Sequence, residues 1–117
     1  MIASKLPDAF LTRWKQFPLD QKILHICAEF SRTKSCLGFS AVDSANHALE
    51  RALELMDFTV ETEGGEARRS FLKEFLRLRE MLAQYYLEPK KEVNELSRLW
   101  RSLLDLDPKV HNLKLEI

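Results

Sequence analysis

The chain of 117 residues has few of the residues that break helices and few of those that form strands. It contains three glycines and four prolines, and Val, Ile and Thr are sparse beside Leu, Ala, Glu, Lys and Arg. This composition favours α-helix over β-sheet. Cys27 and Cys36 are the two cysteines, and their spacing matches no metal or redox motif. We therefore expect two reduced thiols rather than a disulfide framework.

An excess of charge of one sign and long apolar runs are also lacking. The 18 basic and 18 acidic residues give a formal net charge of zero, whereas nucleic-acid-binding proteins usually carry an excess of positive charge. No apolar run approaches the ~20 residues of a membrane span, and the N-terminal residues lack the apolar core of a signal peptide. We expect a cytoplasmic protein with neither a nucleic acid nor a membrane as its partner.

The residues that are present predict one folded helical domain over residues 1–117. Apolar residues recur at steps of three and four, the spacing of one helix face, in five segments. These segments are residues 4–17, 18–36, 40–61, 66–88 and 90–107. Short connections between helices favour antiparallel neighbours. The predicted fold is all-α, an antiparallel up-and-down bundle of four main helices plus a short N-terminal helix split off at Pro18.

The predicted helix boundaries rest on particular residues. Pro18 lacks a backbone donor, so it breaks the first helix and suits the first turn of the second. Gly38 is expected to end the second helix, and Ser40 to cap the third. Pro108 is expected to stop the last helix.

The C-terminal tail, residues 108–117, has a different pattern. Leu113, Leu115 and Ile117 alternate with polar residues, which is the period of an extended segment. Three interpretations remain open: the tail lies over the bundle, docks on a second subunit as an interface, or is disordered.

Six polar residues on the predicted helix 40–61 form what we call the acidic ridge. At about 100° per residue, their side chains point within about 40° of one direction, almost opposite the apolar face. They are Asp43, His47, Glu50, Glu54, Asp57 and Glu61. The ridge can be interpreted as a metal or catalytic site, as a docking face for a basic partner, or as solvated surface paired within the chain.

A metal site is the least favoured of these interpretations. Carboxylate-bridged bundles point Glu and Glu-x-x-His ligands inward from several helices, whereas His47 and Glu50 have the reverse order and point outward. Catalysis by an acid or base favours a buried carboxylate with a raised pKa, which an open ridge does not provide. We assign no catalytic residue, and we expect neither a metal nor another cofactor.

A second line of charge on the next predicted helix offers partners to the acidic ridge. Arg69, Lys73 and Arg77 recur at steps of four, and we call them the basic ridge. If the two helices form an antiparallel hairpin, Asp57 approaches Arg69 or Lys73, and Glu54 approaches Lys73 or Arg77. Exposed pairs of this kind contribute only ~0–1 kcal/mol each, but they select the register of the helices.

The aromatic residues mostly follow apolar faces and are expected in the core. Tyr85 and Tyr86 are adjacent, so both cannot face inward in a helix. One of them, or Phe39 or Phe58, is expected at a helix edge. An exposed aromatic residue there would mark an interface with another protein.

In architecture alone, the chain resembles the small helical bundles called HEPN. Members of that family partner minimal nucleotidyltransferases or act as ribonucleases, and the ribonucleases carry an Arg followed after a few residues by a His near a helix end. Here nine residues separate Arg101 from His111, with Pro108 among them. The sequence departs from the motif, and a likeness of architecture does not transfer function.

Two functional hypotheses follow. The first is a non-enzymatic interaction or adaptor module that binds a protein partner and forms a homodimer, through the tail and a wide apolar face on helix 40–61. That face includes Ala41, Ala48, Leu53 and Leu55. The second is a HEPN-like bundle that handles nucleotides or RNA, with His47 and the acidic ridge, or His111 and Arg101, at its site.

Overall fold

The computed structural model describes residues 8–63 and 68–112, and all regular structure within them is helical. The helices are α1 (Asp8–Gln16), α2 (Leu19–Gly38), α3 (Val42–Thr62), α4 (Arg69–Leu87), α5 (Val93–Leu104) and α6 (Pro108–His111). The predicted all-α class is confirmed. None of these helices combines the length and hydropathy that crossing a bilayer requires.

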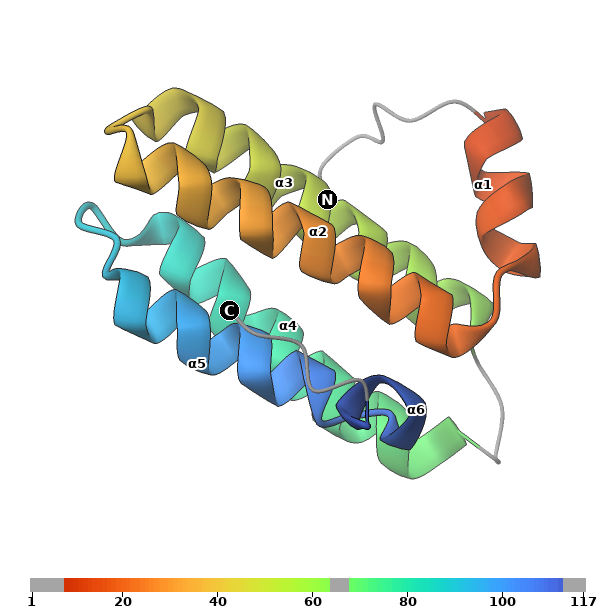
Figure 1. Ribbon diagram of the computed structural model, residues 1–117. Helices are drawn as coiled ribbons and strands as arrows, with labels where there is room; N and C mark the ends of the chain where they lie inside the picture. The colour runs from red at the N-terminus through yellow and green to blue at the C-terminus, as the bar shows by residue number, and fades with distance from the viewer. Residues whose placement is uncertain (1–7, 64–67, 113–117) are drawn as a thin grey trace.

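The four long helices lie side by side, with α1 across one end of the α2–α3 pair (Figure 1). In the bundle α2 packs on α3 and α5, and α4 packs on α3 and α5. Contacts between α3 and α4 run in opposite directions along the two helices. Arg79 Nε donates to Asp57 Oδ1 at 2.9 Å. Tyr86, which comes later in α4, donates to Glu50 Oε1 at 2.6 Å, and Glu50 comes earlier in α3 than Asp57. These two helices are therefore antiparallel.

Helix α1 covers a part of α3 that the sequence had suggested for a partner. Trp14 is buried, and its Nε1 donates to Thr59 Oγ1 at 3.3 Å, which joins α1 to α3. Ala48, Leu53 and Leu55 of the wide apolar face are buried within the single chain. The expectation that this face would be left over for a second subunit was wrong, because α1, α2 and α4 all pack against α3.

The turn between α2 and α3 differs from its prediction in one residue. Gly38 is the last residue of α2, as expected, but Ser40 is no N-cap. It has a φ of 57°, and Ala41 stands at the N-cap of α3 without a side-chain cap bond. Ser40 N donates to Leu37 O at 3.1 Å and Ala41 N to Cys36 O at 2.8 Å. This is the Schellman arrangement, in which the left-handed residue is usually glycine.

The C-terminal tail begins with a helical turn instead of an extended strand. Asp107 caps α6 by accepting from Lys109 N at 2.8 Å, and Pro108 occupies the first turn. Val110 is buried. The prediction of an extended segment from residue 108 onward was therefore wrong for residues 108–111, because a capped Asp-Pro start favours a helical turn. The predicted interface residues Leu113, Leu115 and Ile117 lie outside the described residues.

Helix α2 buries polar residues on a second line beside its apolar face. Lys22, Glu29 and Thr33 are all buried, at steps of seven and four that place them on one side of the helix. Lys22 Nζ donates to Glu63 Oε1 and to Thr62 Oγ1, both at 2.8 Å. Helix α2 packs on both α3 and α5, so it must bury a wider face than an edge helix.

Candidate functional site

The acidic ridge lies along the seam between α3 and α4 and is partly engaged there. Glu50 accepts a hydrogen bond from Tyr86, and His47 Nδ1 lies 3.5 Å from Glu50 Oε2. Asp57 forms a bidentate pair with Arg79. At least three members of the ridge, His47, Glu50 and Asp57, therefore have partners within the chain. Docking of a basic partner there stays a prediction.

The basic ridge does not supply the expected partner of Asp57. The side chain that reaches this carboxylate is Arg79, one residue that the prediction did not consider. Arg77 pairs with Glu74 of its own helix at 3.5 Å, while Arg69 and Lys73 are exposed. The prediction for Asp57 was wrong because it assumed a hairpin centred on Gly64 and Gly65, whereas the contact of Asp57 with Arg79 shows that α4 is shifted along α3.

The histidines of the second hypothesis lie at the surface. His111 Nδ1 lies 2.8 Å from Asp105 Oδ1, and both side chains are more than half exposed. Arg101 is also exposed. His47 belongs to the acidic ridge, on another helix. Across residues 8–63 and 68–112, no group of three His, Cys, Asp or Glu converges as metal ligands would.

Four large apolar residues are exposed at one end of the bundle, which we call the apolar end. Its members are Phe39, Val42, Leu87 and Val93. They come from the α2–α3 and α4–α5 connections and the adjoining helix ends, and Figure 1 places both connections at the same end of the bundle. The exposed fractions of Phe39 and Leu87 are 84% and 76%. Phe58, the other candidate among the phenylalanines, is buried, so Phe39 is the exposed aromatic that the sequence anticipated.

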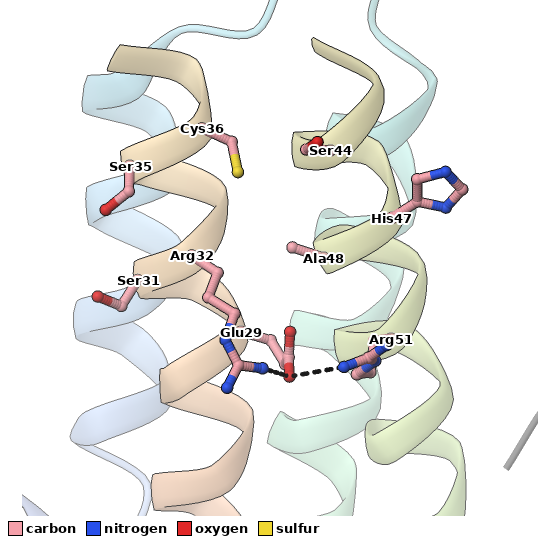
Figure 2. Close-up of a pocket in the computed structure, with 9 residues that line it drawn as sticks. All are labelled: Glu29, Ser31, Arg32, Ser35, Cys36, Ser44, His47, Ala48 and Arg51. Carbon is pink, nitrogen blue, oxygen red and sulfur yellow. Dashed lines mark hydrogen bonds and ion pairs between the residues drawn. The ribbon is translucent and has the colours of Figure 1, made fainter. Parts of the chain in front are cut away.

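A groove of about 370 Å³ runs between α2 and α3 and approaches the apolar end. It is lined by Glu29, Ser31, Arg32, Ser35, Cys36, Ser44, His47, Ala48 and Arg51. Most of these side chains are small, which leaves room between the two helices. Figure 2 shows Cys36 and Ala48 facing the space between α2 and α3, with His47 pointing away from it.

At the floor of this α2–α3 groove, one buried carboxylate holds two arginines. Arg32 Nη1, from the same helix, bonds Glu29 Oε1, and Arg51 Nη1, from α3, lies 3.9 Å from the same oxygen (Figure 2). The Glu29 side chain is 6% exposed, whereas those of Arg32 and Arg51 are 60% and 56% exposed. The arrangement ties α2 to α3 and leaves two guanidinium groups facing solvent.

The two cysteines have different surroundings. Cys27 is buried, and burial raises the pKa of its thiol to about 12. This thiol behaves as a small apolar side chain, as the sequence predicted. Cys36 is partly exposed and lines the α2–α3 groove.

Comparison of the chain with protein-family models, with curated proteins and with solved structures gives no match. Its function must therefore be argued from the described side chains. Neither Glu29 nor Arg32 was among the candidate site residues predicted from the sequence, and the groove was not predicted either. A signal was present, because Lys22, Ile26, Glu29 and Thr33 recur at steps of four, three and four, which is the spacing of a buried helix face.

Proposed function

We propose that this protein is an interaction module that self-associates through its apolar end. The observation that supports the proposal is the exposure of Phe39 and Leu87 at the same end of the bundle, on two separate connections. Removing a large apolar side chain from water contributes about 1.5–3 kcal/mol. Apolar residues gathered on one surface are typical of a protein interface.

The charges beside the apolar end favour a second copy of the chain as the partner. The α4–α5 connection carries two acidic residues, Glu88 and Glu92, and two basic ones, Lys90 and Lys91. A two-fold interface places the same patch opposite itself, so each lysine can face a glutamate of the other copy. A strongly acidic or strongly basic partner would meet like charges as often as opposite ones.

The test is the concentration dependence of the oligomeric state, measured by sedimentation equilibrium or light scattering. Each side chain occurs twice in a two-fold interface, so Phe39→Ser removes at least about 3 kcal/mol of apolar burial. We expect the dimer dissociation constant to rise about a hundredfold. Leu87→Ser should act in the same direction.

A matched control exists on the same helix as Leu87. Leu76 of α4 is also an exposed leucine, and it lies about 16 Å away along the helix axis. Leu76→Ser should leave the dimer unchanged. A chain that stays monomeric at every concentration, or a Leu76→Ser variant that dissociates as readily as Leu87→Ser, would refute self-association through the apolar end.

A further inference from the structure

The charges at the floor of the α2–α3 groove are unequal. Among the described residues that line the groove, Glu29 is the only carboxylate, and it faces both Arg32 and Arg51. Two guanidinium groups that approach one oxygen repel each other, and one carboxylate neutralises only one of them. The site therefore carries a net positive charge, and both arginine side chains remain more than half exposed.

The buried carboxylate of Glu29 positions both arginines before a ligand binds. Each guanidinium uses Nη1 toward Glu29, so the remaining N–H donors of its planar fork can point elsewhere. Such a fork matches two oxygens of a carboxylate or a phosphate. Because Glu29 already restricts both side chains, a bound anion loses less conformational entropy in them than in two unrestrained arginines.

We propose that the α2–α3 groove binds a small molecule through a carboxylate or phosphate group, which Arg32 and Arg51 hold together. The volume of about 370 Å³ lies within the usual range for ligand pockets. Ser44 and the thiol of Cys36 also line it, as hydrogen-bonding groups.

A second cavity on the other side of the same charged group indicates the rest of the ligand. It measures about 230 Å³ and shares Glu29, Arg32 and Arg51 with the first. Phe10, Ala28 and Leu55 contribute an apolar wall there, and His25 completes the lining. The anion therefore binds between two cavities, and the wall at Phe10 fits an apolar body attached to the anionic group.

The test uses inorganic phosphate in one titration and acetate in another, each at constant ionic strength against chloride. The readout is the ¹H–¹⁵N signal of the arginine Nε–H groups in the isotope-labelled full chain. We expect the Arg32 and Arg51 signals to shift and saturate with at least one of the two anions. The anion that saturates at lower concentration identifies the chemical class. A linear drift with both, equal to that with chloride, would overturn the proposal.

Matched variants assign the binding to this site. Arg32→Gln and Arg51→Gln should each raise the apparent dissociation constant at least tenfold. Arg77→Gln is the control, because Arg77 is similarly exposed and also pairs with a glutamate three residues before it. Unchanged binding in both groove variants, or an equal loss in Arg77→Gln, would overturn the assignment. Because these readouts do not involve the apolar end, failure here is distinguishable from failure of the dimer proposal.

Discussion

The buried ion pair between α2 and the end of α3 provides a stringent test of the fold. Lys22 is 1% exposed, and its ammonium bonds Glu63 and Thr62. We propose to replace Glu63 with Gln, which removes the carboxylate that pairs with the ammonium at 2.8 Å. Removing one partner of a buried pair typically costs about 3–5 kcal/mol. Glu63 is 13% exposed and Thr62 remains as an acceptor, so we expect a loss of about 2–3 kcal/mol in unfolding free energy.

Replacing the other partner of the pair, Lys22, should lower the unfolding free energy much less. Lys22→Met places an apolar side chain of similar length in the buried site and removes the charge that needs compensation. Glu63 then keeps a second cation, because Arg68 Nε lies 3.5 Å from its other oxygen, and it retains partial contact with water. We expect a loss of about 1 kcal/mol or less. The double variant should resemble Lys22→Met, because Glu63→Gln has no charge left to expose.

Urea unfolding followed by far-UV circular dichroism measures all three variants. An exposed pair, Lys90 and Glu92 at 3.6 Å, is the control, and Glu92→Gln there should change stability by less than about 0.5 kcal/mol. The reasoning is refuted if Glu63→Gln costs no more than Glu92→Gln. It is equally refuted if Lys22→Met costs more than Glu63→Gln, since the buried ammonium would then not be the side chain that depends on its partner.

Three further predictions concern other sites. Ser40→Gly should raise the unfolding free energy by about 0.5–1 kcal/mol in urea, because φ is 57° there; Ser40→Ala, with no gain, is its control. A thiol reagent should modify Cys36 in the native protein and Cys27 only after unfolding, because Cys27 is buried. Rapid labelling of both cysteines in the native protein would contradict this prediction. Burial raises the pKa of the Cys27 thiol from 9.0, and that of Tyr85 from 10.0, to about 12 in each case. Both groups ionise more readily when unfolded, so their contributions to stability are complete at low pH. The contribution falls above about pH 9 for Cys27 and above about pH 10 for Tyr85, by up to about 1.4 kcal/mol per pH unit and group. Urea titrations of wild type and Cys27→Ala between pH 8 and 11 measure this, and a variant with an unchanged slope would contradict it.

For much of the candidate site, the sequence predicts which types of residue take part but not which individual residues. The sequence predicts that one of four aromatic residues, Phe39 among them, is exposed. Burial of Phe58 and Tyr85 removes two of the four, and Phe39 is the one that is largely exposed. Which apolar residues share its end of the bundle depends on where the α2–α3 and α4–α5 connections meet in space. A single sequence carries no signal for that meeting, because the two connections are far apart along the chain.

The sequence by itself determined the all-α class and most of the apolar faces, since both follow from the local spacing of residues along a helix. Only the tertiary structure decided the axial offset between helices, which pairs Asp57 with Arg79 instead of Arg69 or Lys73. It also decided that Glu29 is buried between two arginines. Periodicity states which residues share a side of one helix. Burial and partners depend on how many neighbouring helices that side meets, and on how the side chains of both helices interlock.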